Sequence, residues 1–278
     1  MKRRSFLVLL PVCCLGTGAL SARATEIVMP TRGISAHRGA SRSHPENTIA
    51  AFKEAIRLGA HQIEFDVYLT RDKKCVVLHD STVDRTTDGS GRVSELTLAE
   101  IKRLDAGIWK GQQFAGQRVP TLQETLAMMP ENIWLNVHTK GGAELGAAVA
   151  REIIRQGRKH QAFLATGREA ADAARKVDPH ILICNMHNQG HDSRYVGETL
   201  ARGDQFLQLY KGVASPEEMA RLKKAGVRVN YCCTNDPAAL KGLFDAGVQF
   251  PLVDDVAGMM KAARDFGIEP LKPVYRKE

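Results

Sequence analysis

The stretch GISAHRGASRSHPENTIAAFKEAIRLGAHQIEFDVYL, residues 33–69, predicts two strands joined by a helix. Residues 33–37 form a short apolar run, and residues 61–69 alternate apolar and polar side chains with the period of a strand. Between them, residues 46–59 space their apolar side chains as one helix face does and end in Gly59, a common stop signal. A strand, a helix and a second strand in this order predict one unit of a parallel sheet.

The same order of elements repeats along the chain. We expect eight strands, at residues 33–37, 61–69, 132–139, 161–166, 181–186, 205–210, 227–232 and 249–255. We expect further helices at residues 143–157, 215–226 and 236–247, each of which ends in glycine. Eight such units favour an α/β fold of the closed (β/α)8 type, a TIM barrel. An open doubly wound sheet is the alternative, but no Gly-x-Gly-x-x-Gly motif follows the first strand.

The run CVVLHD, residues 75–80, interrupts this alternation. Only TRDKK separates it from the second strand, which is too short for a parallel crossover. The sequence therefore predicts a small β-hairpin and loop insertion after the second strand. With the turn centred near Asp72 and Lys73, His79 returns to a place opposite or nearly opposite Asp66. This is the carboxyl end of the barrel, where barrel enzymes hold their catalytic groups.

Ionisable side chains converge on this end of the predicted barrel. Glu64 and Asp66 alternate with apolar residues that should face the helices, so both carboxylates should point inward. The same alternation in residues 132–139 sends His138 inward, together with Lys140 just beyond, and His37 ends the first strand. A single such group is usually a surface residue, but a convergence from several strands predicts a functional site.

The chemistry of this set favours phosphoryl transfer. Buried ions are costly unless they pair or bind a cation, and a divalent metal between Glu64 and Asp66 would relieve their repulsion. Oxygen ligands suit Mg²⁺ or Ca²⁺. The metal and nearby cations would stabilise charge on phosphoryl oxygens, while one histidine takes a proton and another delivers one. Hydride transfer lacks its cofactor motif, and acyl transfer lacks a serine elbow.

The motifs of residues 34–126 resemble those of the glycerophosphodiester phosphodiesterase family. The resemblance rests on AHRGASRSHPENTIAAFKEAIRLGA, IEFDVYLTRDKKCVVLHDSTVDRTTDGSGRV, LTLAEIKRLDAGIW and VPTLQETL. It is looser afterwards, where NDPAALKGLFDAGV and Asp254 or Asp255 are similar to the end of the family pattern. The resemblance implies a barrel enzyme that uses a divalent cation to cleave glycerophosphodiesters into glycerol 3-phosphate and an alcohol.

The resemblance also implies roles for individual residues. His37 and His79 would be the acid/base pair, and Arg38 and Lys140 would bind the phosphate. Glu64 and Asp66 would bind the metal. In the segment that begins the first helix, we expect Asn47 to cap the helix, with a hydrogen bond to a ligand as the alternative.

Two positions depart from the family pattern. His138 stands where the family has a third metal carboxylate. We expect His138 to bind the metal, and an imidazole ligand shifts the metal preference towards Mn²⁺, Zn²⁺ or Co²⁺. The alternative is that His138 hydrogen-bonds to a metal ligand without touching the metal. Cys232 and Cys233 stand where the family often has Trp-Thr, which leaves the range of alcohols open. We expect both cysteines, like Cys75 and Cys184, to be buried thiols, with binding of a soft metal by the adjacent pair as the alternative.

Residues 1–24 have the basic start, apolar middle and small-residue end of an export signal, and RRSFL resembles a twin-arginine signal. We therefore expect an exported protein, periplasmic or secreted, whose domain comprises residues 25–278. Four of the 39 Lys and Arg residues lie in the signal, so 35 basic residues remain against 31 acidic ones, and the net charge of the mature domain is +4. This small excess forms no basic run, so we expect a small-molecule glycerophosphodiester as substrate rather than nucleic acid.

Two alternatives to this function stay open. A barrel of this kind could bind phosphodiesters without hydrolysing them, or hydrolyse a lysophospholipid or a glycerophosphate polymer by the same chemistry. No amphipathic segment for membrane docking is evident, so we expect no stable membrane insertion of the mature chain. The sequence predicts no oligomeric state.

Overall fold

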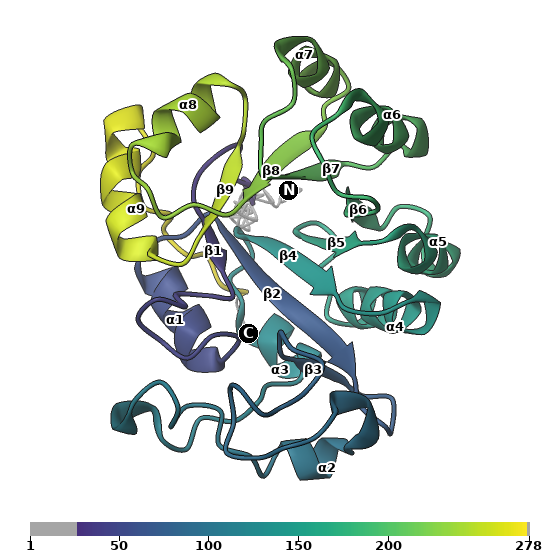
Figure 1. Ribbon diagram of the computed structural model, residues 1–278, viewed down its shortest axis with the longest axis vertical. Coiled ribbons are helices and arrows are strands. Elements are labelled where there is room, and N and C mark those ends of the chain that lie inside the picture. The colour runs from purple at the N-terminus through teal and green to yellow at the C-terminus, as the bar shows by residue number, and fades with distance from the viewer. Residues whose placement is uncertain (1–26, 277–278) are drawn as a thin grey trace, which may run out of the picture.

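The computed structural model describes residues 27–276, and within them eight parallel strands close into a barrel (Figure 1). The strands are β1 (Ser35–His37), β2 (Gln62–Leu69), β4 (Trp134–Thr139), β5 (Ala162–Thr166), β6 (Leu182–Asn185), β7 (Phe206–Tyr210), β8 (Arg228–Cys232) and β9 (Phe250–Val253). Each pairs with the next around the barrel, and β1 pairs with β9 to close it. Every strand lies within its expected range, so the predicted TIM barrel is confirmed. The predicted export signal, residues 1–24, lies outside the described residues.

Helices follow the strands and surround the barrel (Figure 1). They are α1 (Ile49–Arg57), α3 (Leu122–Met128), α4 (Ala143–Arg155), α5 (Arg168–Val177), α6 (Ser193–Arg202), α7 (Pro216–Lys224), α8 (Ala239–Asp245) and α9 (Val256–Ala263), with a 3-10 turn η3 (Arg264–Phe266) at the end. Gly59 follows α1 with a φ of 81°, and a Cβ atom there would lie 2.4 Å from Cβ of Pro270. The turn therefore requires glycine both for its backbone conformation and for space.

Apolar side chains fill both sides of the barrel wall. Ile63, Phe65 and Val67 of β2 pack outward with α1 and its neighbours, as the strand alternation predicted. Inside the barrel, aromatic residues from the first halves of their strands form a layer that includes Phe163 and Phe206, whose stacked rings lie 3.8 Å apart. This layer closes the amino-terminal half of the interior, so the inward polar side chains gather at the carboxyl ends of the strands.

The predicted hairpin is confirmed. The short strand β3 (Cys75–Val77) pairs antiparallel with β2, and the backbone N–H of Leu78 donates to the carbonyl of Asp66 at 3.0 Å. His79 therefore lies one residue beyond the position opposite Asp66. The insertion then continues through η1 (Val93–Glu95), α2 (Leu98–Ile101) and η2 (Gln112–Phe114), which form a lobe beside the barrel with a small apolar cluster of its own (Figure 1).

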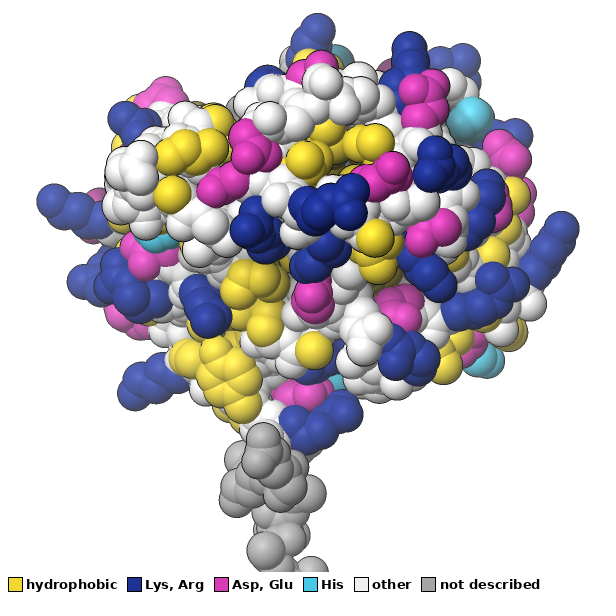
Figure 2. All heavy atoms as spheres, turned by 90° about the horizontal axis from the view of Figure 1, so that it is seen from below, with side chains coloured by type: hydrophobic (Ala, Val, Ile, Leu, Met, Phe, Trp, Pro, Cys, Tyr) yellow, Lys and Arg dark blue, Asp and Glu magenta, His cyan; other side chains and the backbone are white. Residues whose placement is uncertain are grey.

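The outer surface carries charges of both signs. On the face drawn in Figure 2, basic side chains are interspersed with acidic ones instead of forming one continuous basic area. Within residues 27–276, no helix combines the length and the apolar character needed to cross a bilayer.

Candidate active site

Closure of the barrel brings His37, at the end of β1, beside Asp254, which directly follows β9. His37 Nδ1 lies 2.8 Å from Asp254 Oδ1, and Ser41 Oγ and Asn235 Nδ2 each donate to the same carboxylate at 3.0 Å. The hydrogen bond from His37 is the main cause of the lowered pKa of Asp254. Burial favours neutral His37, but the bond to Asp254 and the charge of Glu64 outweigh it and raise the pKa of His37.

His79 has the same kind of partner. Its Nδ1 lies 2.7 Å from Asp80 Oδ1, and Arg85 Nε donates to Asp80 Oδ2 at 2.6 Å. The hydrogen bonds from Arg85 and then from His79 outweigh burial and lower the pKa of Asp80 to about 2. Both histidines therefore present Nδ1 to an ionised carboxylate, which leaves Nε2 as the ring nitrogen available for proton transfer.

Between them lies a cluster of three metal-ligating side chains, Glu64, Asp66 and His138. Glu64 and Asp66 are only 2% and 1% exposed, and His138 Nδ1 lies 3.6 Å from Glu64 Oε1 and 3.2 Å from Asp66 Oδ1. One ligand atom from each of the three lies within 4.8 Å of the other two. Burial would raise the pKa of Asp66, but the hydrogen bond from His138 and the charges of His138, Lys140 and His79 lower it.

This donor set fits a divalent cation. Two carboxylates and one imidazole offer oxygen and nitrogen ligands of the types that bind Mg²⁺, Mn²⁺ and Zn²⁺. A divalent cation bound among these side chains would also offset the cost of burying two carboxyl groups side by side. The structure therefore brings together the three residues that the sequence predicted as metal ligands.

Two cationic side chains border the cluster. Lys140 Nζ lies 3.1 Å from Asp66 Oδ1, and the backbone N–H of Arg38 donates to Glu64 Oε2 at 3.0 Å. Arg38 has a φ of 58°, a conformation that non-glycine residues adopt at a cost and that often marks functional sites. Its Nε is buried without a hydrogen-bond partner among residues 27–276. Arg38 Nε lies 3.6 Å from Asp66 Oδ2, so both positive charges lie beside this carboxylate.

Comparisons with known proteins identify this arrangement. Residues 37–184 match the Glycerophosphoryl diester phosphodiesterase family. A glycerophosphodiester phosphodiesterase of Caldanaerobacter subterraneus subsp. tengcongensis is 34% identical over 240 residues, which are 84% of this chain and 98% of that protein. The chain belongs to this family. The predicted class of enzyme, a glycerophosphodiester phosphodiesterase, is thereby confirmed.

Solved structures agree with the phosphodiesterase fold. A phosphodiesterase of Oleispira antarctica, solved in complex with the product sn-glycerol-3-phosphate, is 26% identical, with a TM-score of 0.72 over 84% of this chain and 96% of that one. A glycerophosphodiester phosphodiesterase of Agrobacterium tumefaciens is also 26% identical, with a TM-score of 0.70 over 84% of this chain and 99% of that one.

Asn47 has a different role in the phosphodiesterase from the predicted helix cap. Thr48 caps α1, because its side chain accepts from the backbone N–H of Ala51. Asn47 Nδ2 donates to Asp66 Oδ2 at 2.9 Å, and its Oδ1 accepts from the backbone N–H of Asp66 at 3.2 Å. Asn47 therefore fixes the orientation of a candidate metal ligand. The helix-start pattern hid this role, since Asn at such a position usually caps.

Asp254 and Arg85 contact the candidate site, and the sequence assigned neither of them a role. Asp254 is 217 residues from its partner His37 along the chain, so only the closed barrel shows their contact. Arg85 connects the two sides of the site, because it donates both to Asp80 and to Glu46, while Glu46 also accepts from Arg38 at 2.9 Å. For Asp254, the available signal was its place directly after the last strand.

The prediction of four buried thiols is wrong for two of them. Cys232 and Cys233 are joined by a disulfide and are half-buried at the end of β8. Cys184 is a buried free thiol as predicted, and Cys75 is a half-buried free thiol.

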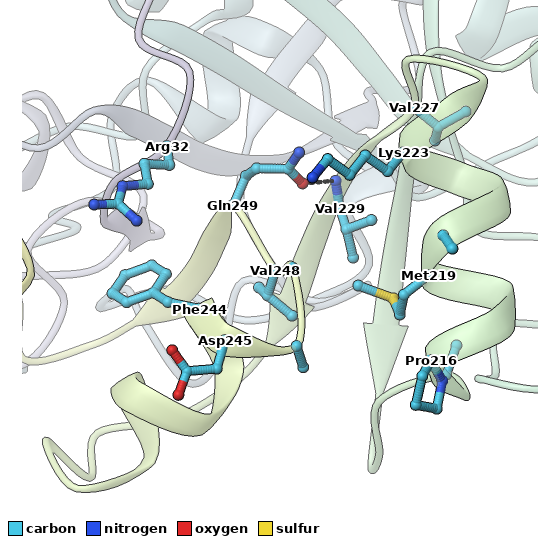
Figure 3. A pocket seen from close by; sticks show the side chains of 14 residues that line it. Arg32, Pro216, Met219, Lys223, Val227, Val229, Phe244, Asp245, Val248 and Gln249 are labelled. Atoms are coloured by element: carbon cyan, nitrogen blue, oxygen red, sulfur yellow. Dashed lines mark hydrogen bonds between the residues drawn. The ribbon is translucent and has the colours of Figure 1, made fainter.

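A separate pocket of about 450 Å³ lies at the opposite end of the barrel (Figure 3). Residues at the starts of β8 and β9 line this pocket. Among them, Gln249 Oε1 accepts a hydrogen bond from the backbone N–H of Val229 at 2.7 Å. Met219 and Phe244 supply apolar walls, and Lys223 lies at its rim. Because the catalytic groups lie where the strands end, this pocket is not part of the active site.

Proposed function

We propose that this phosphodiesterase hydrolyses glycerophosphodiesters to sn-glycerol 3-phosphate and an alcohol, with a divalent cation held by Glu64, Asp66 and His138. The observation that carries the proposal is the pair of histidines, each with Nδ1 on a carboxylate, on either side of these buried ligands. The product bound by the Oleispira antarctica relative supports the choice of substrate class.

His37 and His79 are the acid/base pair in this proposal. Each carboxylate partner accepts a hydrogen bond from Nδ1–H, which fixes the tautomer and leaves Nε2 to accept a proton when the ring is neutral. One histidine removes the proton of the attacking hydroxyl or water, and the other delivers a proton to the departing alcohol oxygen. The same two side chains serve whether the attack comes from water or from a hydroxyl of the glycerol.

Arg38 and Lys140 bind the phosphate. Their positive charges lie beside the carboxylate of Asp66 and favour binding of the phosphodiester anion. A bound cation supplies further stabilisation of negative charge on the phosphoryl oxygens. Mg²⁺ or Ca²⁺ suits the two carboxylates, and the imidazole of His138 shifts the preference towards Mn²⁺, Zn²⁺ or Co²⁺.

Metal reconstitution tests the proposal. The purified chain is stripped of metal, and release of glycerol 3-phosphate from glycerophosphocholine is followed as Ca²⁺, Mg²⁺, Mn²⁺, Zn²⁺ or Co²⁺ is returned singly. We expect a divalent ion to restore hydrolysis, and the His138→Glu variant to prefer Ca²⁺ or Mg²⁺ more strongly than the parent. The His37→Ala and His79→Ala variants should lose most of the activity with every ion.

The outcomes separate the parts of the proposal. Hydrolysis that is equal with and without metal would refute the role of the cation. A silent enzyme on a panel that also contains a lysophospholipid and a glycerophosphate polymer would refute the hydrolase reading and favour a binding barrel. An unchanged ion preference in His138→Glu would refute direct ligation by His138.

We also propose that the chain is exported to the periplasm or the medium under the direction of residues 1–24. The support is the sequence alone, with Arg3 and Arg4 before an apolar segment. Fusion of residues 1–24 to a folded reporter should carry the reporter out of the bacterial cytoplasm. Replacement of both arginines by lysine should reduce that export, and unchanged export would rule out the twin-arginine route.

A further inference from the structure

The end of β8 brings two sulfur atoms to the edge of the active site. Cys233 Sγ lies 4.0 Å from His37 Nδ1. One ring nitrogen of His37 and the sulfurs of Cys232 and Cys233 all lie within 4.8 Å of one another. This second cluster shares no side chain with the Glu64, Asp66 and His138 cluster, and it comes from the opposite side of β1, where β9 and β8 follow.

The two clusters offer different donor atoms. Two thiolates and an imidazole form a soft to borderline set, which favours Cd²⁺, Zn²⁺ or Cu⁺. Two carboxylates and an imidazole form a harder set. A soft ion that meets both clusters should therefore prefer the sulfur-containing one, provided that the sulfurs are reduced.

We propose that reduction of the Cys232–Cys233 disulfide creates a second metal site, in which Cys232, Cys233 and His37 bind a thiophilic divalent cation. The inhibitory part of the proposal rests on the proposed function, because an ion on His37 removes one of the two acid/base groups. The enzyme would then be active in its disulfide form, and sensitive to soft metals in its dithiol form.

The chemistry of the two steps balances. A dithiol reductant gives two electrons and two protons to the Cys232–Cys233 disulfide, so the S–S bond breaks, two thiols form and the reductant becomes a disulfide. The cation then replaces the two thiol protons, which leave to solvent as the thiolates bind. For Nδ1 of His37 to bind the ion, its proton moves through solvent to Nε2, and the hydrogen bond to Asp254 is given up. Both cysteines are half-buried, so a small reductant and a hydrated ion can reach them.

The remaining thiols of the described chain are poor competitors. Cys75 is on β3 and Cys184 is on β6, and neither belongs to a metal-ligating cluster within residues 27–276. Burial raises the pKa of Cys75 to about 12 and also raises the pKa of Cys184. The thiolate is the form that binds metal, so a thiol with a raised pKa is a weak ligand. A Cys75→Ser variant therefore removes one thiol without removing a proposed ligand, and it is the matched control.

Cadmium titration tests the site without relying on catalysis. The full chain, with Cys13 and Cys14 replaced by serine so that no other adjacent thiol pair is present, is the parent protein for this titration. It is reduced with dithiothreitol, freed of it without oxygen, and titrated with Cd²⁺ in excess Mg²⁺, an ion that suits the carboxylate cluster. The readout is the ultraviolet charge-transfer band of cadmium thiolate. We expect the band to saturate at about one Cd²⁺ per chain in the reduced protein and in Cys75→Ser. It should be absent from the disulfide form.

Variants assign the ligands. Cys232→Ser and Cys233→Ser should each weaken Cd²⁺ binding by at least about tenfold, because loss of a direct ligand costs no less than loss of an outer partner. His37→Ala should keep a thiolate band but bind Cd²⁺ at least about tenfold more weakly. In the parent enzyme, Cd²⁺ should suppress hydrolysis after reduction and much less before it.

The first result that would overturn the proposal comes from the parent protein alone. A reduced parent protein that shows no cadmium thiolate band, or the same band before and after reduction, would exclude the site. A full-strength band in Cys233→Ser would exclude it as well. Failure of the proposed function is a separate result, since an enzyme that hydrolyses nothing in its disulfide form can still be titrated spectroscopically.

Discussion

Replacement of Asp254 by asparagine tests whether this carboxylate sets the protonation of His37. Asp254 Oδ1 accepts from His37 Nδ1 and from Ser41 Oγ, and Oδ2 accepts from Asn235 Nδ2. In Asp254→Asn, an amide oxygen turned to His37 leaves the amide N–H₂ against the donor of Asn235. The opposite rotamer turns a donor towards Nδ1 and forces the proton to Nε2, which is the wrong tautomer for a base.

The magnitude follows from the bond that is lost. A hydrogen bond to a charged group contributes about 1.5–3 kcal/mol, which corresponds to roughly 10- to 160-fold in rate if it acts in the transition state. We therefore expect kcat for glycerophosphocholine to fall by that factor in Asp254→Asn at saturating metal. Metal affinity should stay near that of the parent, because Asp254 is not in the Glu64, Asp66 and His138 cluster.

The neighbouring carboxylate provides the matched control. Asp255 caps α9 by accepting from the backbone N–H of Gly258 at 3.0 Å, and it has no hydrogen bond to His37. Asparagine caps helices as well as aspartate does, so Asp255→Asn should keep both stability and kcat. The smallest fall in kcat that we expect for Asp254→Asn is roughly tenfold. A kcat within about twofold of the parent value, or an equal loss of kcat in Asp255→Asn, would therefore refute the role assigned to Asp254.

Three further predictions follow from single contacts. Asn47→Ala removes both hydrogen bonds to Asp66, so metal affinity measured by calorimetry should fall about 10- to 100-fold, and unchanged affinity would contradict the positioning role. Phe163→Ala opens the fully buried aromatic layer and should lower the free energy of unfolding in urea by about 3–5 kcal/mol, whereas a loss under 1 kcal/mol, roughly a surface value, would mean that the layer does not pack as described. The lowered pKa of Asp80 stabilises the folded state above the unfolded pKa of about 3.9, and this contribution is lost as pH falls through about 2. The difference in unfolding free energy between the parent and Asp80→Asn should therefore shrink over that range, and a constant difference would contradict the ion pair with Arg85.

The fold was predictable because its signals are local. Strand alternation and helix periodicity appear within windows of five to fifteen residues, roughly the length of one element, and the glycines that end the helices act within one turn. The hairpin was predictable for a related reason, since the five residues 70–74 cannot span a parallel crossover. Neither argument needs knowledge of what lies across the barrel.

The candidate site was predictable only where strand alternation fixes the direction of a side chain. Glu64, Asp66 and His138 were placed together because parallel neighbours in register point the same way, and Asp66 does pair with His138. The contact of Asn47 with Asp66 depends on the left-handed backbone at Asn47, with a φ of 57°, which no periodic pattern encodes. The disulfide was missed because a prediction of burial says nothing about whether neighbouring thiols are oxidised.

The contact between His37 and Asp254 depends on a small part of the barrel. In the closing pair of strands, Ser35 lies opposite Leu252 and Ala36 opposite Val253; His37 is the next residue of β1, and Asp254 directly follows β9. A slip of one residue would move one side chain by about 3.3 Å and turn it to the other face. The orientation of a proposed acid/base group therefore rests on two strand pairings at the seam between β1 and β9, and on flanking backbone bonds from Gly33 to Gln249 and from Arg42 to Asp254. Because this register places His37 against Asp254, perturbation of the seam should impair catalysis before it unfolds the rest of the barrel.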